Sequence, residues 1–153
     1  MRPLLQIGFR LRRFLLRRLR VRTRGVKAML FNESGELLLI RNSYGDRSVF
    51  VLPGGGIGRR ETPAAAAARE VREEVGLEIR DLAFVSTHLS SAEGRRDTIH
   101  LFRGRVGASP VADGLEVAEA RFFPLDALPA AVSAATLRRV AELKGERPID
   151  PAW

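Results

Sequence analysis

Four glutamates lie close together in the segment PGGGIGRRETPAAAAAREVREEVGL, residues 53–77. At a spacing of three and four residues, Glu70, Glu73 and Glu74 share one side of a helix. Like charges this close repel one another and raise the pKa of at least one carboxyl group unless a cation intervenes. Carboxylate oxygens suit Mg²⁺ or Mn²⁺, and Mg²⁺ commonly also binds water and substrate phosphates. The pattern therefore indicates metal-assisted attack of water on a phosphate chain.

The residues around the carboxylates predict how they are positioned. Thr62 can cap a helix whose first turn contains Pro63, and Gly76 suits the left-handed position at its end. The glycines before Thr62 allow the backbone to approach a metal or a phosphate closely. The competing interpretation is a solvent-exposed acidic helix face, which is the common fate of a charged run.

The wider pattern decides between these interpretations. It reads Gly55, five residues, Glu61, seven residues, Arg69-Glu70-Val71, one residue, Glu73-Glu74, one residue and Gly76-Leu77. This segment resembles the Nudix box, the signature of the Nudix hydrolase family, at every defining position. Seven fixed residues, each occurring at roughly one in fifteen by average composition, should almost never align by chance in a short chain. With the predicted strands and closing helix, the resemblance extends over most of residues 23–145.

The resemblance implies a fold and an activity. The expected fold is the α/β Nudix fold, a mixed β-sheet sandwiched between α-helices. The expected reaction is Mg²⁺-dependent hydrolysis of a pyrophosphate bond in a nucleoside diphosphate linked to another group, with Mn²⁺ as the possible alternative metal. By resemblance, Glu70, Glu73 and Glu74 are the metal-binding carboxylates, and the backbone carbonyl of Gly55 or its neighbour completes the site.

The resemblance also implies supporting roles. Arg69 and Glu61 are expected to hold the ligand carboxylates in place. In this family the general base is either a box glutamate or an acidic residue from a later loop, and Glu70 is our first candidate. Glu116 is the candidate for an additional metal ligand and Glu119 is its rival, with surface exposure as the alternative for both.

Substrate contacts are expected outside the box. Arg41 and Arg47 could bind phosphate, and Phe50 could stack on a base, although burial explains Phe50 equally well. Arg95 and Arg96 could likewise contact phosphate or face water. The sequence does not identify the group attached to the nucleotide.

Hydrophobic patterns predict the remaining elements. His88 and His100 are isolated and are interpreted as structural residues, because two single imidazoles make neither a triad nor a zinc site. The expected strands cover residues 25–31, 36–42, 48–53, 77–87, 97–106 and 120–123, and a closing helix is expected over residues 130–145.

The charge is unevenly distributed. Residues 1–27 contain ten of the 26 Lys and Arg residues and none of the 18 Asp and Glu residues. Residues 1–22 predict a basic amphipathic helix, and residues 23–153 form the expected Nudix hydrolase domain. This helix could dock on the domain, lie on an anionic membrane surface or contact RNA. A mitochondrial transit peptide is a weaker alternative.

Composition adds few constraints on location and assembly. The chain has no cysteine, which excludes disulfides and a thiolate zinc site and fits a reducing, cytoplasmic compartment. A homodimer is possible. Two alternative functions remain: a Nudix-fold module that binds a nucleotide without turnover, and a pyrophosphohydrolase acting on RNA 5′ ends.

Overall fold

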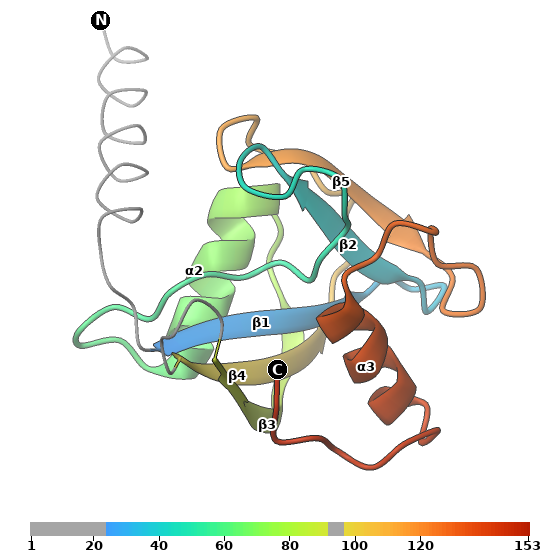
Figure 1. Ribbon diagram of the computed structural model, residues 1–153. Helices are drawn as coiled ribbons and strands as arrows, with labels where there is room; N and C mark the ends of the chain where they lie inside the picture. Colours follow the sequence, from blue (N-terminus) through green and yellow to red (C-terminus); the bar gives the residue numbers. More distant parts are fainter. Residues whose placement is uncertain (1–23, 92–96) are drawn as a thin grey trace, which may run out of the picture.

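A computed structural model describes residues 24–91 and 97–153. The amphipathic helix predicted for residues 1–22 lies outside the described residues, as do Arg95 and Arg96. Five strands form one mixed sheet in the order β3-β4-β1-β2-β5 (Figure 1). The strands are β1 (Arg24–Phe31), β2 (Leu37–Asn42), β3 (Arg80–Ser90), β4 (Asp97–Arg105) and β5 (Val117–Phe123), and the helices are α2 (Pro63–Val75) and α3 (Ala134–Leu143).

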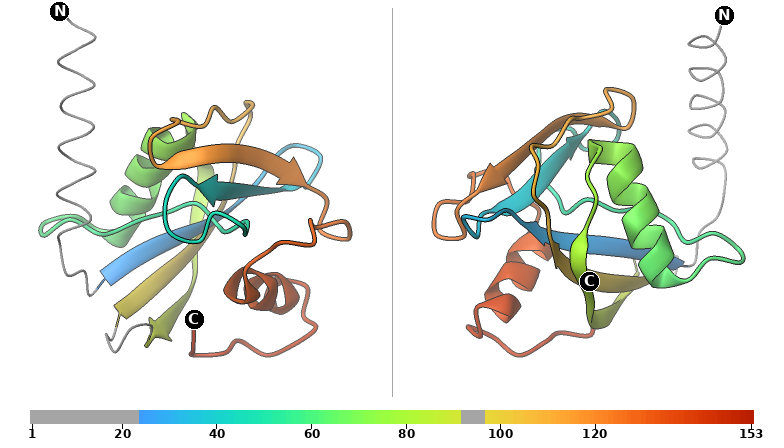
Figure 2. Two further views of the ribbon diagram at one scale, coloured as in Figure 1. Left: turned by 45° about the horizontal axis from the view of Figure 1, so that its top comes forward. Right: turned by 180° about the vertical axis from the view of Figure 1, so that it is seen from behind.

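Strand β1 separates two hydrophobic layers. Because side chains alternate across a strand, Ala28 and Leu30 face one side, where they pack with Val71 and Val75 of α2. Met29 points to the other side and shares a core cluster with Val140 of α3. The two helices therefore cover opposite faces of the sheet (Figure 2), which confirms the predicted arrangement of a mixed sheet between helices.

The strands β1 and β2 meet only near their connecting turn. Their paired register contains Phe31 and Leu37, and beyond this pair the strands diverge. The segment between β2 and α2 crosses the space between the two diverging strands. It forms one isolated bridge from Val51 to β2 and another from Gly56 to β1. The predicted strand over residues 48–53 is therefore wrong, because these residues pass from one strand to the other.

The ends of α2 confirm the sequence prediction. The Thr62 hydroxyl oxygen accepts a hydrogen bond from the Ala65 N–H at 3.2 Å, and Pro63 opens the helix. Gly76 ends it with φ of 70°, and its N–H donates to the Arg72 carbonyl. This left-handed residue stops the helix directly after its last carboxylate-bearing turn.

Other boundaries differ from the prediction. Strand β3 begins at Arg80 and continues to Ser90, because Leu89 and Ser90 still pair with Thr98 and Asp97 of β4. Leu89 also exchanges backbone hydrogen bonds with Pro151 and Trp153 of the C-terminal segment. The last helix begins only at Ala134, since Ser133 caps it. Strand β5 begins three residues before the predicted position of residue 120. Among the described residues, no helix is long and apolar enough to cross a membrane.

A buried polar network joins β3, α3 and the C-terminal segment. We call it the tail cluster, and its members are His88, Arg139, Glu142, Asp150 and Trp153. The His88 Nδ1 atom lies 2.6 Å from the Arg139 guanidinium and 2.7 Å from the Asp150 carbonyl oxygen. Arg139 donates to Glu142 at 2.7 Å and lies 5.4 Å from the centre of the Trp153 ring. His88 therefore has the structural role that its isolation predicted.

Candidate active site

The helix α2 presses two glutamates against the glycine loop, which we define as residues 53–58. Glu70 is 1% exposed and Glu74 is 5% exposed. A Cβ at Gly55 would lie only 2.5 Å from the carboxyl carbon of Glu70, so glycine is required for this carboxylate to reach the loop. At Gly54, where φ is 140°, a Cβ would lie 2.2 Å from the Val26 carbonyl oxygen. The glycines thus let the loop lie tightly between α2 and β1.

Burial sets the ionisation of Glu74. Loss of contact with water raises the pKa of Glu74 to about 8, and the nearby carboxylates of Glu70 and Glu116 push it in the same direction. The Lys27 ammonium and a hydrogen bond of 2.9 Å from the Gly54 N–H oppose this rise. Burial and neighbouring carboxylates together therefore disfavour the ionised form of Glu74.

Arg69 connects the glutamates to the glycine loop. Its guanidinium donates to Glu61 at 2.7 Å and to Glu70 at 2.8 Å, and it lies 3.4 Å from Glu73. It also donates to the Gly56 carbonyl at 2.9 Å. The hydrogen bond to Glu61 is the main reason that the pKa of Arg69 is raised. These contacts place Arg69 where the sequence prediction requires an orienting residue.

The Glu61 carboxylate binds both the glycine loop and Arg69. Its Oε2 atom accepts hydrogen bonds from the Gly58 N–H at 2.8 Å and from Arg69 at 2.8 Å. Arg69 and Glu61 are partly buried, with 29% and 20% of their side-chain surfaces exposed. The pair therefore fixes the loop against the first turns of α2.

The donor set fits a hard divalent cation. The available groups are carboxylates on α2 and backbone carbonyls of the glycine loop, which are the oxygen ligands that such cations prefer. The raised pKa of the buried Glu74 also indicates that a cation would stabilise its ionised form. Within residues 24–91 and 97–153, no three acidic or imidazole side chains are already arranged to hold a metal ion. In this arrangement Arg69 contacts Glu70 and Glu73, and Glu74 accepts a hydrogen bond from the Gly54 N–H.

The carbonyls of the glycine loop already have partners. The Gly55 carbonyl accepts from the Val26 N–H at 2.8 Å. The Gly54 carbonyl lies 3.5 Å from the Lys27 ammonium. A carbonyl oxygen has two lone pairs, so each can accept a second interaction.

Lys27 is the site residue that the sequence prediction missed. It stands in the apolar strand β1, and its ammonium donates to the Leu52 carbonyl at 2.9 Å. Burial lowers the pKa of Lys27 from its ordinary value, and the carboxylates of Glu74 and Glu70 oppose this. The available signal was a lone lysine inside an otherwise apolar strand pattern, which is costly to bury without a purpose.

The two candidate acids of the later segment separate in the structure. Glu116 is close enough to Glu74 to contribute to its raised pKa. Glu119 instead forms an ion pair with Arg41 across β2 and β5 and lies 3.6 Å from Arg121. The position of Glu116 supports it over Glu119 as the additional ligand.

The predicted substrate contacts do not converge on one point. Phe50 is 9% exposed and packs edge-on against Phe123, with ring centres 5.1 Å apart, so it belongs to the core. Arg41 lies over the Phe50 ring at 5.6 Å and pairs with Glu119. Arg47 is exposed in the connection after β2. These positions favour a structural role for Phe50 and leave Arg47 accessible to substrate.

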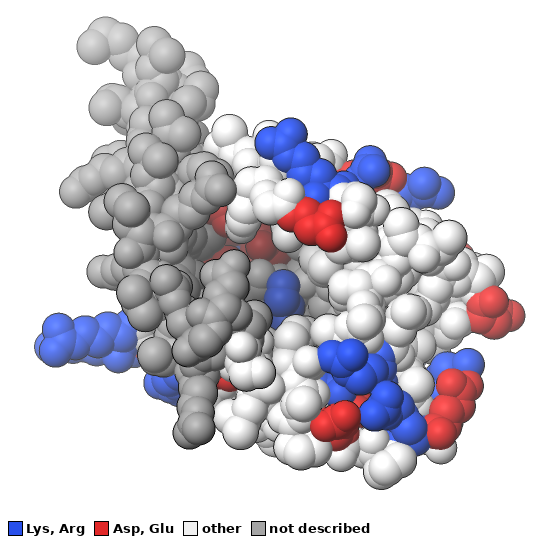
Figure 3. Space-filling model, in the orientation of Figure 1, with Lys and Arg blue, Asp and Glu red and all other residues white. Residues whose placement is uncertain are grey.

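A cavity of about 280 Å³ opens beside the glycine loop. Its wall includes Lys27, Arg24, Gly55, Asp97 and Ile99, from β1, the loop and the start of β4. Figure 3 shows a hollow on this face of the molecule, with basic and acidic side chains at its floor. Three glycines of the loop, Gly54, Gly55 and Gly56, line this cavity together with Lys27.

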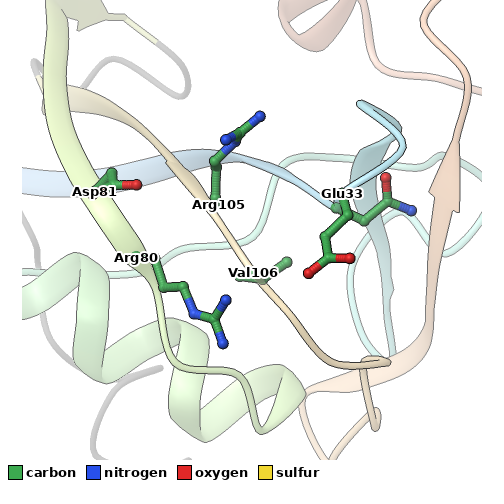
Figure 4. A pocket seen from close by; sticks show the side chains of 6 residues that line it. Glu33, Arg80, Asp81, Arg105 and Val106 are labelled. Carbon is green, nitrogen blue, oxygen red and sulfur yellow. The ribbon is translucent and has the colours of Figure 1, made fainter.

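A second cavity, of about 320 Å³, lies at the opposite end of β1 (Figure 4). Arg80, Asp81, Arg105 and Glu33 line it, so charges of both signs surround the space. It is separated from the glycine loop by the length of β1 and includes none of the box residues. This cavity is therefore not the predicted active site.

Comparison with known proteins agrees with the geometry. A family model described as the NUDIX domain matches residues 21–143. A protein of Bacillus subtilis (strain 168), which bears the provisional name 8-oxo-dGTP diphosphatase, is 32% identical over 108 residues, covering 70% of each chain. An RNA pyrophosphohydrolase of Pseudomonas paraeruginosa is 41% identical over 61 residues, which cover 40% of this chain and 37% of that protein.

Solved structures give the same fold. A MutT NUDIX hydrolase from Burkholderia pseudomallei superposes with a TM-score of 0.70 and 22% identity, covering 81% of this chain and 99% of that one. Together with the match over residues 21–143, this shows that the chain belongs to the Nudix family. It is a Nudix hydrolase, and members of this family typically need a divalent metal.

Proposed function

We propose that this Nudix hydrolase cleaves a pyrophosphate bond in a nucleotide-derived substrate with Mg²⁺ as its metal. The observation that carries the proposal is the burial of Glu70 and Glu74 against the glycine loop. Such an arrangement concentrates negative charge where it costs stability unless a cation is bound. The names of the B. subtilis and P. paraeruginosa relatives support a phosphoric anhydride as the bond that is cleaved.

The side chains have separable roles in this proposal. Glu70, Glu73 and Glu74 would hold the metal, and Glu116 would add a carboxylate from the segment before β5. Arg69 keeps Glu70 and Glu73 on the side that faces the loop. When bound, the metal neutralises phosphate charge and lowers the pKa of an attacking water. Glu70 would accept the proton of that water.

The test is a substrate panel with and without Mg²⁺. Nucleoside triphosphates, oxidised nucleoside triphosphates, ADP-ribose, nucleotide sugars and dinucleoside polyphosphates would be incubated with the full chain. Released phosphate, pyrophosphate and nucleoside monophosphate are then measured. We expect one substrate class to be hydrolysed only when Mg²⁺ or Mn²⁺ is present. No turnover by a folded protein that binds Mg²⁺ would support the non-catalytic binding module.

RNA 5′ ends are a second candidate substrate. The 41% identity to an RNA pyrophosphohydrolase favours it, and residues 1–22 supply basic side chains that could bind RNA phosphates. Deleting residues 1–22 is the discriminating experiment. Loss of RNA turnover with retained nucleotide turnover would support the RNA role. If the truncated protein keeps both activities equally, residues 1–22 do not serve RNA binding. Their role would then be docking on the domain, binding to an anionic membrane surface or contact within a homodimer.

A further inference from the structure

Lys27 occupies an unusual place for a lysine. It lies in the middle of β1, between the buried residues Val26 and Ala28. The chain contains only one other lysine, Lys144, which lies after α3 and forms an ion pair with Glu146. A charged side chain in a sheet interior is costly unless its surroundings compensate the charge.

The compensation comes from the active site. The Lys27 ammonium donates to the Leu52 carbonyl at 2.9 Å and lies 3.5 Å from the Gly54 carbonyl. The N–H of the same Gly54 donates to Glu74 at 2.9 Å. Gly54 is thus bound through its carbonyl to Lys27 and through its N–H to Glu74. Lys27 and the carboxylates are linked through one residue of the loop.

We infer that Lys27 is a positioning residue of this active site, whose ammonium assembles the glycine loop and the α2 carboxylates before the metal binds. This inference rests on the proposed metal-dependent function. It goes beyond the Nudix box, because Lys27 lies on β1, outside the box. Lys27 acts through the loop and the carboxylates and does not replace any of the proposed ligands.

The inference has two consequences of opposite sign. The Lys27 ammonium repels an incoming divalent cation, so removing its charge should strengthen metal binding. The same ammonium holds two loop carbonyls, so removing its hydrogen bonds should loosen the loop and slow turnover. A residue that served only as packing or as a loop anchor would weaken metal binding when removed.

Three substitutions separate charge from hydrogen bonding. Lys27→Met removes both the charge and the donor, Lys27→Gln removes the charge and keeps an amide donor, and Lys27→Arg keeps the charge. Lys144→Met is the matched control, since it removes the other lysine at a surface position. Each protein would be titrated with Mn²⁺ by calorimetry, and thermal unfolding in EDTA would verify that it is folded.

We expect Lys27→Gln, which removes the charge and keeps a donor for the loop carbonyls, to bind Mn²⁺ about tenfold more tightly than wild type, as removal of one nearby repelling charge predicts. Lys27→Met also loses the loop contacts, so its gain in affinity should be smaller. Lys27→Arg and Lys144→Met should keep the wild-type affinity. Turnover should fall in Lys27→Met and fall less in Lys27→Gln. If Lys27→Met does not fold, Lys27→Gln carries the affinity test alone.

The outcomes distinguish this inference from the proposed function. Mn²⁺ affinity that is unchanged or weaker in Lys27→Gln overturns the role of Lys27 and leaves the metal site standing. Failure of the wild-type chain to bind Mn²⁺ overturns the proposed function itself.

Discussion

Two regions of this molecule bury charged groups, and they do so in different ways. In the tail cluster, Arg139 and Glu142 have side-chain exposures of 0% and 5% and form an ion pair of 2.7 Å. In the candidate active site, Glu70 and Glu74 are equally buried, and burial raises the pKa of Glu74 to about 8. One region balances its charges internally, whereas the other holds an excess of carboxylates.

The difference follows from what each region has to do. The tail cluster joins β3, α3 and the C-terminal segment. Its Arg139 donates to the Ala152 carbonyl, and its Glu142 accepts from the Asp150 N–H. The carboxylates of α2 point at a loop whose glycines leave no side chains between them and the backbone. Paired buried charges are typical of structural joints, and an excess of one sign is typical of functional sites.

The largest expected effect is loss of turnover when a carboxylate of α2 is neutralised. Glu70→Gln should reduce kcat by roughly 10³-fold, within the range for removal of a general base. Its thermal stability in EDTA should be equal to or greater than that of wild type, because one repelling charge is removed. Steady-state kinetics and thermal unfolding provide the two readouts. Wild-type turnover by Glu70→Gln and Glu73→Gln would show that these carboxylates are not needed for catalysis.

A substitution that disrupts the tail cluster should lower stability and leave turnover nearly unchanged. Arg139→Met leaves Glu142 buried without its partner and should lower the free energy of unfolding by about 3 kcal/mol. Chemical denaturation measures this loss. At a temperature where the variant is folded, its kcat should remain within about twofold of wild type, as expected for a distant site. A large loss of kcat without a loss of stability would show that the two regions are not separable in this way.

The smallest effect concerns pH. Burial lowers the pKa of His88 from its ordinary value of 6.5, and the Arg139 guanidinium adds to this while Glu142 and Asp150 oppose it. Below pH 6.5 the unfolded state binds a proton that the folded state does not, so acid favours unfolding. Stability should fall by at most about 1.4 kcal/mol per pH unit in this window.

Comparison with His88→Gln isolates this contribution. The variant should show a flatter pH dependence of unfolding between pH 6.5 and the lowered pKa of the wild-type imidazole. Equal slopes for the two proteins would show that His88 does not titrate differently in the folded and unfolded states.

The sequence predicted those parts of the molecule that depend on local chemistry. The Thr62 cap and Gly76 define α2 from neighbouring residues alone, and the box spacing places Arg69 between Glu61 and Glu70. Both follow from helix geometry and from short-range hydrogen bonds. The candidate carboxylates could therefore be named without knowledge of the tertiary structure.

Long-range contacts account for what the sequence did not predict. Lys27 is 25 residues from Leu52 in sequence, and nothing in the strand pattern reveals that the two meet. The sequence around Val51 has the local pattern of a strand. Because β1 and β2 diverge, this segment instead passes from β2 to β1 and forms only isolated bridges with them. Strand β3 extends to Ser90 because Leu89 continues to pair with Thr98 of β4, and the C-terminal segment also returns to bond with Leu89.

The most direct test of the central claim is calorimetric titration of the full chain with Mn²⁺, in parallel with a Glu70→Gln/Glu73→Gln variant and with Glu142→Gln from the tail cluster. The account predicts stoichiometric binding to wild type and to Glu142→Gln, and loss of binding in the double variant. Equal binding by all three proteins would contradict the claim that the α2 carboxylates form the metal site.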